Sequence, residues 1–524
     1  MDNLLIVIPA IKKNAVIPDQ LIKKLDGITL IQRAINTALD MVNNKNIFII
    51  TDSQEISLIS ERNGIEYYLD PNLKLNSGNI LELTLNTTKK FSHTNILLYR
   101  ANTPLVGSDI LLNAYNEFKK DISYMLVSIK INEKKLLKLD NGFLHSVDDG
   151  IYFNELKSFY IFNKYNLDVK KSKPFIIKQE KSIEILSYQD WWVCEKILKR
   201  KKIIFNVIGN IEIGMGHIYH SLALAHEITD HEIIFVCDEK YKIAVDKLAS
   251  SDYKVISTPN ILNTIIQIKP NLVINDILNT EYKYIRCLKN CGIKVVNFED
   301  LGDGSHFADI VFNELYDKPI FNDKNFRWGY NYLALRDEFY EAVPHDILED
   351  IREVLITFGG ADQNNLTLIA LKSIINKCKK LNIKINIVCG EAYRFKNELH
   401  DYISKVSYKN IYLTYASEVI SKIMEKSQLA ISSNGRTVYE LADMNIPSIV
   451  ISHHERENTH SFARPERGFI NLGVINESIE KKIKDKFDKL VDDIDYRKLL
   501  FLNIKEYNFR DNKQKVVKEI LSLI

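Results

Sequence analysis

The sequence predicts an α/β protein with more than one domain, and three observations lead to this fold class. Its 524 residues exceed what one hydrophobic core ordinarily accommodates. Short apolar runs typical of buried strands alternate with segments whose apolar residues recur at helical spacing. Polar or glycine-rich residues follow several of the apolar runs. Because such alternation favours strand–helix–strand units and a mainly parallel sheet, ligands are expected at the carboxyl ends of the strands.

The first 200 residues contain one such alternation, which we interpret as one α/β domain. The expected strands are residues 4–9, 46–51, 95–100 and 124–131, and the expected helices are residues 29–42, 56–63 and 108–120. The alternation restarts after a basic run at residues 199–202, which we interpret as a solvated linker. The predicted domain boundary therefore lies at residue 200.

Two further alternations fill the rest of the chain. The first has expected strands at residues 203–208, 232–237, 271–275 and 294–298, with a helix at residues 218–228. The second has expected strands at residues 354–357, 383–388, 429–432 and 448–451. We therefore expect two similar α/β lobes, residues 201–345 and 346–524, with a cleft between them.

Composition and charge exclude several classes of protein. Hydrophobic residues make up 46% and charged residues 26% of the chain, as in globular proteins. The formal net charge is +2, so the overall charge does not attract nucleic acid or an anionic membrane. No apolar run is long enough to span a bilayer, and residues 1–8 are typical of a first strand and not of a signal peptide.

The six cysteines are scattered and lack the spacing of zinc ligands. We expect free thiols in a reducing cytosol, and hence a cytoplasmic protein. The oligomeric state stays open, and an oligomer is compatible with the sequence.

The most informative motif is a glycine-rich turn between an expected strand and an expected helix. It contains Gly209, Gly214 and Gly216 and closes with His217. Backbone N–H groups and the positive end of a helix can face an anion there. One imidazole beside a phosphate site suits general base catalysis on a nucleotide sugar. A histidine in such a turn can also be structural, so the motif alone leaves both interpretations open.

Two strand ends of the second lobe also carry glycines. Gly359 and Gly360 lack side chains, so the backbone there can approach a phosphate closely. The residues that open the helix after the strand at 429–432 are Asn434, Gly435, Arg436 and Thr437. This helix start offers free N–H groups, and Arg436 is a candidate for a charge-assisted contact to a diphosphate. Glu440 either accepts hydrogen bonds from a ribose or only favours the helix N-terminus.

A second polar cluster, residues 453–457 together with His460, contains three histidines and two glutamates. Its spacing differs from His-Glu-x-x-His, and it follows an expected strand instead of lying within a clear helix. We interpret the cluster as polar lining of the cleft. A metal site and plain surface are the alternatives, and we assign no metal ligand.

Motifs between residues 201 and 475 resemble, in order and spacing, the UDP-sugar hydrolases of pseudaminic acid biosynthesis. The motifs are residues 214–217, 222–225, 299–301, 308–313, 329–339, 358–362 and 433–435. This family has the GT-B fold of two α/β lobes and is related to the bacterial murein glycosyltransferase. The resemblance implies hydrolysis of a UDP-linked acetamido-deoxy sugar, by attack of water at the anomeric carbon, with release of UDP.

The resemblance also implies roles for particular residues. The histidine of the family's Gly-x-Gly-His motif falls on His217, whose neutral imidazole would take the proton of the attacking water. The residues near UDP would be Gly360, Asn434, Gly435 and Glu440. Backbone N–H groups would stabilise the departing diphosphate, so no metal or other cofactor is expected in this part of the chain.

Two departures from the family lie near the expected sugar. His220 stands where the family usually has an arginine, three residues beyond the catalytic histidine. Leu278 stands where the family usually has a tyrosine, two residues after Asp276. We take Gly214, Gly216, His220 and Asp276 as further candidate substrate-binding residues. The identity of the sugar stays open.

A glycosyltransferase is the first alternative, because the same two-lobe fold transfers sugars from UDP-sugars to an acceptor hydroxyl. Such an enzyme needs an acceptor groove, often apolar, and the sequence shows no obvious apolar-basic stripe. A non-catalytic binding or scaffolding protein is a third class. The intact turn at residues 214–217 argues against it for this part of the chain.

Residues 1–200 resemble the CMP-sugar synthetases, the cytidylyltransferases that activate sialic acid and its relatives. The matching motifs are residues 8–10, 17–18, 25–27, 30–31, 51–52, 102–105, 183–185 and 189–191, the last two as a closing strand and helix. The resemblance implies a single nucleotide-binding α/β sheet that takes CTP and a nonulosonic acid, with Mg²⁺. The two resemblances together imply a fused enzyme of nonulosonic acid biosynthesis.

The basic loop after the first strand, which must neutralise a triphosphate, departs from this family. The family's basic positions hold Ile11, Ala15, Gln20 and Leu21. Lys12 and Lys13 remain, at shifted positions. The family's paired metal aspartates fall on Glu184 and Leu186, and a Mg²⁺ site that loses one of two carboxylates binds more weakly.

Two interpretations of residues 1–200 follow. Either the domain transfers a cytidylyl group, or it is a degenerate module kept for substrate binding, assembly or channelling. Asp52 and Arg100 are expected to be cleft residues in both cases.

Overall fold

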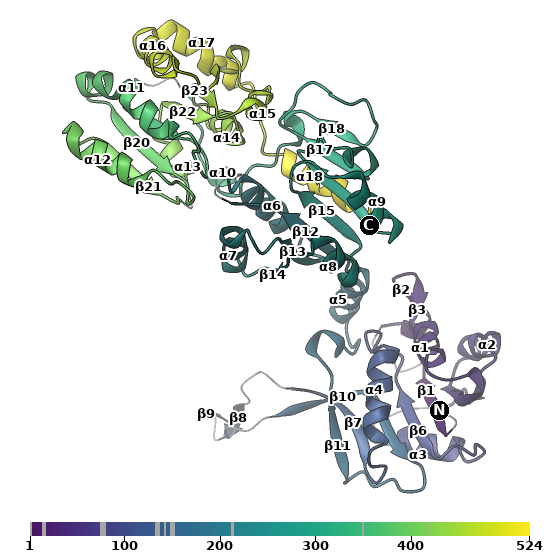
Figure 1. Cartoon of the computed structure of the whole chain (residues 1–524). Coiled ribbons are helices and arrows are strands. Elements are labelled where there is room, and N and C mark those ends of the chain that lie inside the picture. The colour runs from purple at the N-terminus through teal and green to yellow at the C-terminus, as the bar shows by residue number, and fades with distance from the viewer. Residues whose placement is uncertain are drawn as a thin grey trace. The chain divides into compact units, whose positions relative to one another are not determined.

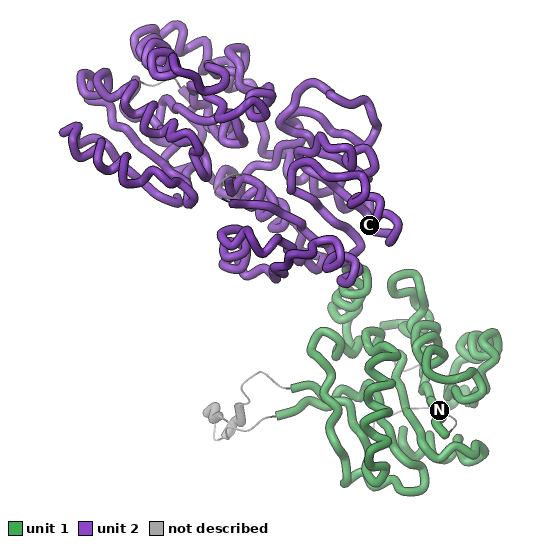
Figure 2. The backbone as a smooth tube through the Cα atoms, in the orientation of Figure 1, with its two compact units in different colours: residues 1–200 green, residues 201–524 purple. Residues whose placement is uncertain are grey.

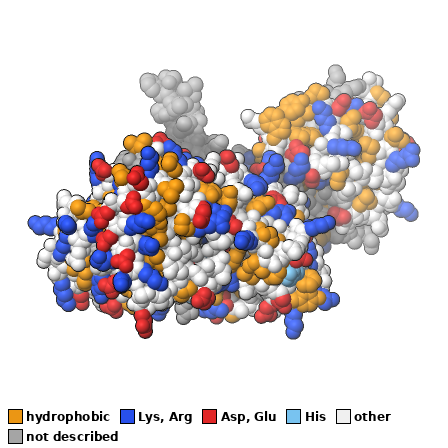
Figure 3. Space-filling model, turned by 90° about the horizontal axis from the view of Figure 1, so that it is seen from above, with side chains coloured by type: hydrophobic (Ala, Val, Ile, Leu, Met, Phe, Trp, Pro, Cys, Tyr) orange, Lys and Arg blue, Asp and Glu red, His pale blue; other side chains and the backbone are white. Residues whose placement is uncertain are grey.

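The structure, a computed structural model, describes residues 3–12, 17–73, 80–131, 137–140, 143–146, 152–210, 214–347, 350–417 and 419–524. Its three large sheets are wholly or mainly parallel and are packed with helices, so the predicted α/β class is confirmed (Figure 1). The chain divides into two compact units, unit 1 (residues 1–200) and unit 2 (residues 201–524) (Figure 2). Within the described ranges, no helix is long and apolar enough to cross a bilayer. On the face drawn in Figure 3, basic and acidic side chains are interspersed, in keeping with the net charge of +2.

Unit 1 is built on a seven-stranded sheet in the order β11-β7-β10-β6-β1-β4-β5. Strands β5, β4, β1 and β6 run parallel, β10 is antiparallel to β6 and β7, and β11 is parallel to β7. The strands are β1 (Leu4–Ala10), β4 (Ile47–Thr51), β5 (Glu66–Leu69), β6 (Asn95–Tyr99), β7 (Met125–Ile131), β10 (Phe153–Asn163) and β11 (Ser172–Ile176). Two small hairpins are β2 (Lys24–Leu25) with β3 (Ile28–Thr29), and β8 (Leu137–Asp140) with β9 (Phe143–Ser146). The helices are α1 (Leu30–Leu39), α2 (Gln54–Arg62), α3 (Ile80–Thr87), α4 (Ser108–Phe118) and α5 (Tyr188–Lys199).

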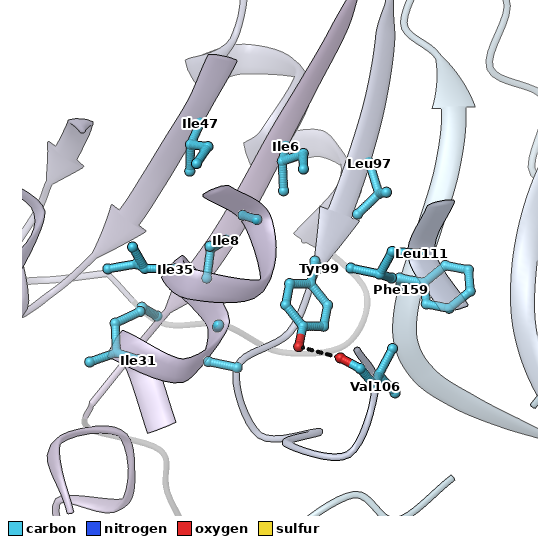
Figure 4. Close-up of a cluster of buried hydrophobic side chains, with 14 of the residues drawn as sticks. Ile6, Ile8, Ile31, Ile35, Ile47, Leu97, Tyr99, Val106, Leu111 and Phe159 are labelled. Carbon is cyan, nitrogen blue, oxygen red and sulfur yellow. Dashed lines mark hydrogen bonds between the residues drawn. The ribbon is translucent and has the colours of Figure 1, made fainter. Parts of the chain in front are cut away.

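Strand β1 carries the core of unit 1, because both of its faces are buried. Ile6 and Ile8 lie on the same face, as alternate residues of a strand do, and belong to one cluster with Ile31 of α1 (Figure 4). Tyr99 of β6 joins this cluster, and its hydroxyl donates to the carbonyl of Val106 at 3.0 Å. The apolar run that predicts a buried strand therefore forms an interior strand of the sheet, between β6 and β4.

The predicted strand at residues 183–185 is wrong. These residues form an irregular segment before α5. The backbone N–H of Ile185 donates to the carbonyl of Asn102 at 2.9 Å, and its carbonyl accepts from Nε2 of Gln20 at 2.9 Å. The isoleucines on either side of Glu184 give the alternating apolar pattern that is typical of a strand. Three residues of this pattern do not show whether a neighbouring strand is present to pair with them.

The first lobe of unit 2 is a seven-stranded sheet in the order β14-β13-β12-β15-β16-β17-β18, in which every pair is parallel. Its strands are β12 (Lys202–Val207), β13 (Glu232–Cys237), β14 (Lys254–Ser257), β15 (Leu272–Asp276), β16 (Lys294–Phe298), β17 (Ile310–Asn313) and β18 (Phe326–Trp328). The accompanying helices are α6 (Gly216–His226), α7 (Lys242–Ser250), α8 (Ile261–Ile268) and α9 (Tyr282–Asn290).

The second lobe is a six-stranded sheet in the order β21-β20-β19-β22-β23-β24, again wholly parallel. Its strands are β19 (Glu353–Thr357), β20 (Lys384–Cys389), β21 (Ile411–Tyr415), β22 (Leu429–Ser433), β23 (Ser448–Ser452) and β24 (Phe469–Val474). The helices after the first lobe's sheet are α10 (Glu338–Glu341), α11 (Leu366–Leu381), α12 (Lys396–Val406), α13 (Ser421–Met424), α14 (Thr437–Asp443), α15 (Glu455–Asn458), α16 (Ile479–Asp492), α17 (Ile494–Ile504) and α18 (Asn512–Leu521). Unit 2 therefore has the two-lobe, GT-B-like architecture that the sequence predicts.

The last helix departs from the predicted lobe boundaries, which assigned all of residues 346–524 to the second lobe. Val516, Val517 and Ile520 of α18 pack in the core of the first lobe, with Phe205 of β12. The buried ammonium of Lys513 lies 3.0 Å from a carboxylate oxygen of Glu227, at the end of α6. Helical periodicity predicts that α18 has an apolar face, but it does not say which lobe covers that face.

Candidate active site in residues 201–524

Three buried carboxylates lie at the carboxyl ends of the first lobe's strands. Asp276 is the last residue of β15, Glu299 directly follows β16, and Glu314 directly follows β17. Because β15, β16 and β17 are neighbours in a parallel sheet, these side chains share one edge. Glu299 has a φ of 52°, a left-handed conformation uncommon outside glycine, which turns the chain at the end of β16.

His217 and His220 lie one turn apart on α6 and share the carboxylate of Asp276. Nδ1 of His217 lies 2.6 Å from Oδ1 of Asp276, and Nδ1 of His220 lies 2.7 Å from Oδ2. The hydroxyl of Ser221 also donates to Oδ2, at 3.2 Å. An ionised carboxylate only accepts, so both imidazoles carry hydrogen on Nδ1. Nε2 of a neutral His217 is then left as an acceptor.

Asp276 and His217 favour each other's charged forms. Burial alone would raise the pKa of Asp276, but the charges and hydrogen bonds of the two histidines hold that pKa well below its ordinary value. Burial alone would lower the pKa of His217, but the charge and hydrogen bond of Asp276, with the charge of Glu299, raise that pKa above its ordinary 6.5. His217 is therefore a stronger base than a free imidazole, and it is protonated in more of the molecules near neutral pH.

Arg436, at the start of α14 in the second lobe, contacts the same carboxylates. Its Nη1 forms an ion pair with Glu314, while Nη2 lies 3.4 Å from Oε2 of Glu299 and 3.9 Å from Oδ1 of Asp276. Burial opposes the charge on the guanidinium, but these carboxylates raise the pKa of Arg436 above its ordinary value, so it stays charged. A contact of Arg436 with a diphosphate, as the sequence predicts, would compete with these ion pairs.

Glycine-rich turns of the two lobes meet in the cleft. Gly214 has a φ of 87°, which favours glycine, and its N–H donates to the carbonyl of Asn210 at 2.8 Å. A Cβ on Gly360 would lie 3.0 Å from the backbone nitrogen of Met215, so the missing side chain lets the lobes approach here. A Cβ on Gly390 would lie 2.3 Å from the carbonyl oxygen of Gly360, which makes this packing tight on both sides.

Two adjoining cavities occupy the cleft, with volumes of about 950 and 1330 Å³, both including open solvent. The predicted residues that line both cavities are Gly216, Gly359, Gly360, Arg436 and Thr437. His217, Gly214 and Gly435 line only the larger cavity, whereas His220 and Glu440 line only the smaller one. The structure therefore brings most of the predicted site residues of unit 2 to one cleft.

Asp276 and Asn434, which the sequence predicts to contact substrate, line neither cavity. Asp276 lies behind the histidines that it binds. Nδ2 of Asn434 donates to the carbonyls of Glu457 at 2.9 Å and His460 at 3.0 Å. Both side chains therefore hold other parts of the site in place.

Glu440 has a partner that neither sequence interpretation included. Its Oε1 accepts a hydrogen bond of 2.7 Å from Nε of Arg336, in the segment between the two lobes. Burial opposes the charge of Arg336, but Glu440 and Glu338 raise the pKa of Arg336 above its ordinary value. The ion pair between Glu440 and Arg336 thus forms part of the wall of the smaller cavity.

The polar cluster at residues 453–457 and 460 contributes five residues to the lining of the larger cavity, namely His453, His454, Arg456, Glu457 and His460. His460 connects to the first lobe, because its Nε2 lies 3.5 Å from Oε1 of Glu299. Oε2 of Glu457 accepts from the backbone N–H of His453 at 2.6 Å. In the parts of the chain that the structure describes, no group of three His, Cys, Asp or Glu side chains is arranged to hold a metal ion.

No family model matches the chain. An uncharacterized protein of Methanocaldococcus jannaschii is 31% identical over 280 residues, which are 48% of this chain and 56% of that protein. The UDP-2,4-diacetamido-2,4,6-trideoxy-beta-L-altropyranose hydrolase of Campylobacter jejuni is 26% identical over 249 residues, or 46% of this chain and 87% of the hydrolase. The spore coat polysaccharide biosynthesis protein SpsG of Bacillus subtilis is 26% identical over 284 residues, which are 51% of this chain and 82% of SpsG. The chain thus spans little more than half of the archaeal relative.

Two solved structures resemble separate parts of the chain. MurG of Acinetobacter baumannii is 14% identical with a TM-score of 0.43, over 62% of this chain and 99% of MurG. A CMP:2-keto-3-deoxy-manno-octonic acid synthetase complexed with CTP is 9% identical with a TM-score of 0.30, over 37% of this chain and 98% of the synthetase. Because both scores are low, the fold assignment rests on the strand order and register of this chain.

Sequence reasoning did not select Glu299 or Glu314 as site residues. Both directly follow buried strands, which was the available signal. Glu314 directly follows the buried run at residues 310–313. That run is part of the motif at residues 308–313, which was used only as evidence for the family resemblance, so the residue after it was not considered. A rule that takes every polar residue at the end of a buried parallel strand would have found both.

In unit 1, the candidate residues around Glu184 do not fit a Mg²⁺ site. Oε1 of Glu184 lies 3.2 Å from Nη1 of Arg100 and accepts from Nδ2 of Asn102 at 3.1 Å. Leu186 stands exposed at the position of the second carboxylate and offers no oxygen ligand. A single carboxylate that already pairs with an arginine is a poor donor set for this ion.

Lys12 is engaged by acidic side chains. Its ammonium lies 3.1 Å from Oδ1 of Asp19 and pairs also with Glu55, and these hydrogen bonds raise the pKa of Lys12. Its backbone N–H donates to Oδ1 of the buried Asp52 at 2.7 Å. Lys13 lies outside the described residues.

Glu299 is expected to stabilise unit 2 above about pH 5. Burial alone would raise its pKa, but the nearby imidazole of His460, at 3.5 Å, and the charges of His217 and Arg436 lower that pKa to about 2, from an ordinary 4.5. The stabilisation is therefore present above the unfolded pKa and is lost as the pH falls toward the folded one. We expect Glu299→Gln to lower the unfolding free energy near neutral pH by up to about 3 kcal/mol, and by less at about pH 3.

Tryptophan fluorescence can measure the unfolding free energy of unit 2 alone. Trp191 and Trp192 belong to unit 1, and Trp328 belongs to unit 2. In a background with Phe at the first two positions, the urea dependence of the Trp328 signal reports the unfolding of unit 2. Glu281→Gln is the control, since Glu281 is exposed. An effect of Glu299→Gln that does not change with pH would contradict the expected result.

Proposed function

We propose that residues 201–524 hydrolyse a UDP-linked acetamido-deoxy sugar, with His217 as the general base that activates water. The observation that carries this proposal is the 2.6 Å hydrogen bond between Asp276 and His217, which lines the larger cavity. The carboxylate orients the imidazole and leaves Nε2 available to accept a proton. The relatives named for UDP-sugar hydrolysis and for polysaccharide biosynthesis support this class of substrate.

In the proposed reaction, Nε2 of His217 takes a proton from water while the water oxygen bonds to the anomeric carbon. The bond from that carbon to the diphosphate oxygen breaks, and its electron pair leaves with UDP. The backbone at Gly359 and Gly360 is the proposed contact for the diphosphate, and Glu440 is the proposed contact for the ribose. Asp276 stabilises the imidazolium of His217 until the proton returns to solvent.

The test offers purified protein a UDP-diacetamido-trideoxyhexose without an acceptor and measures free UDP. We expect release that His217→Asn lowers by about a hundredfold or more. His306→Asn is the matched control, because His306 lies outside both cavities. Release that His217→Asn leaves unchanged would overturn the role of His217.

Glycosyl transfer is the alternative reaction for the same cleft. It predicts UDP release only after an acceptor sugar is added, so the same assay separates the two reactions. Cytidylyl transfer by residues 1–200 stays a prediction from the resemblance, and release of pyrophosphate from CTP in the presence of a nonulosonic acid would test it.

A further inference from the structure

His220 lies in a position that substrate binding alone does not explain. Its side chain is 1% exposed, although it reaches the wall of the smaller cavity. Its Nδ1 lies 2.7 Å from Oδ2 of Asp276. Its Nε2 lies 4.0 Å from Oε1 of Glu314 and has no hydrogen-bond partner among the described side chains and backbone groups. The ring of Phe298 packs edge-on against the imidazole, with centroids 4.7 Å apart.

Charged groups surround the two histidines from several elements. Asp276 ends β15, Glu299 follows β16 and Glu314 follows β17. The second lobe contributes Arg436, which pairs with Glu314, and His460, which lies beside Glu299. Within this set, Asp276 is the group that contacts both imidazoles directly.

We propose that His220 is a positioning residue: by occupying Oδ2 of Asp276, it fixes the carboxylate so that Oδ1 holds His217 with Nε2 toward the substrate. This role rests on the proposed function of His217. A carboxylate bound at both oxygens cannot rotate freely, and Ser221 adds a second contact to Oδ2 at 3.2 Å. His220 also shares the negative charge of Asp276, so less of that charge is available to stabilise the imidazolium of His217.

Removal of His220 therefore has two consequences. The carboxylate of Asp276 is then held at Oδ2 only by the longer Ser221 contact of 3.2 Å and rotates more easily, which lowers the fraction of molecules with His217 in the productive orientation. The undivided charge of Asp276 also favours protonation of His217, so its neutral form appears only at higher pH.

Two amide substitutions separate the two sides of the imidazole. The amide nitrogen of Asn lies near the position of Nδ1, so His220→Asn keeps a donor for Asp276. The amide of Gln reaches the position of Nε2, so His220→Gln directs its donor toward Glu314 and leaves only the Ser221 hydroxyl as a donor to Oδ2 of Asp276. His220→Leu fills the space with no donor at all.

We expect His220→Gln and His220→Leu to lower kcat/KM for UDP release about tenfold and to move the acid limb of its pH profile up by about one unit. His220→Asn should recover most of this loss. A merely structural role would lower activity in proportion to stability and would leave the acid limb in place. Equal losses in the Asn and Leu variants, or an unshifted limb in the Leu variant, would overturn the proposal.

A readout without substrate separates this proposal from the proposed function. The nitrogen-15 shifts of His217, assigned by comparison with His217→Asn, give its protonation state as a function of pH. We expect a higher pKa of His217 in His220→Leu than in the wild type, and a value close to wild type in His220→Asn. Such a shift without UDP release from any UDP-sugar would overturn only the proposed function. UDP release without the shift would overturn only the role of His220. If thermal unfolding shows that the Leu variant is unfolded, the comparison of the Asn and Gln variants tests the role of His220 instead.

Discussion

In the proposed hydrolysis, replacing Asp276 by Asn is expected to lower kcat/KM for UDP release about a thousandfold or more. The carboxylate presents two acceptors to two imidazole Nδ1–H groups, whereas an amide presents one acceptor and one donor. If the amide nitrogen faces His217, Nδ1 of His217 must accept, Nε2 then carries the hydrogen, and the ring cannot take a proton from water. If the amide nitrogen faces His220, His217 keeps its tautomer but loses the charge that stabilises its imidazolium.

Steady-state UDP release and the dissociation constant of UDP are measured together for this variant. We expect the dissociation constant to stay within about threefold of the wild-type value, because Asp276 lines neither cavity. Asp238→Asn is the matched control, since Asp238 also directly follows a strand but pairs with Lys240, at 3.0 Å. A loss of UDP affinity as large as the loss of kcat/KM would show that Asp276 acts in binding, and would contradict the assigned role.

Local signals in the sequence predict the strands and His217, whereas Asp276 is a candidate through the family resemblance. Apolar runs predict β12 and β15, and Asp276 is the last residue of β15. The glycine turn drew attention to His217. Because β12 and β15 are neighbours in the sheet, the helix that follows β12 brings His217 to the end of β15. The hydrogen bond joins positions 59 residues apart, and no spacing in the sequence encodes such a pairing.

Contacts between lobes were beyond sequence reasoning. Arg436 was assigned to a diphosphate from the properties of its own helix, yet its guanidinium meets Glu314, 122 positions earlier in the chain. Helix α18 was assigned to the second lobe by its place in the sequence, yet Val516 and Ile520 are buried in the first. Both features depend on which surfaces meet after folding, and amphipathic spacing does not specify the partner surface.

Replacing Arg436 by Met is expected to lower the unfolding free energy of unit 2 by about 3–5 kcal/mol. Arg436 pairs with Glu314 and Glu299 and lies 3.9 Å from Asp276, and all three carboxylates are buried. Methionine retains the apolar length of the side chain but not the charge, so the carboxylates stay out of water without their counterion. The measurement is urea unfolding followed by Trp328 in the tryptophan background described above.

A second substitution tests whether lost charge pairing is the cause. A neutral amide at position 314 needs no counterion, so Glu314→Gln added to Arg436→Met should recover about 1 kcal/mol or more. A coupling energy near zero between the two substitutions would contradict this explanation. Arg286→Met is the control: Arg286 is exposed on α9, and its loss should change stability by less than about 0.5 kcal/mol. A large coupling energy between Arg436 and Glu314 would mean that their ion pair stabilises the contact between the two lobes at the site. A diphosphate that binds Arg436 in place of Glu314 would then have to supply the same stabilisation.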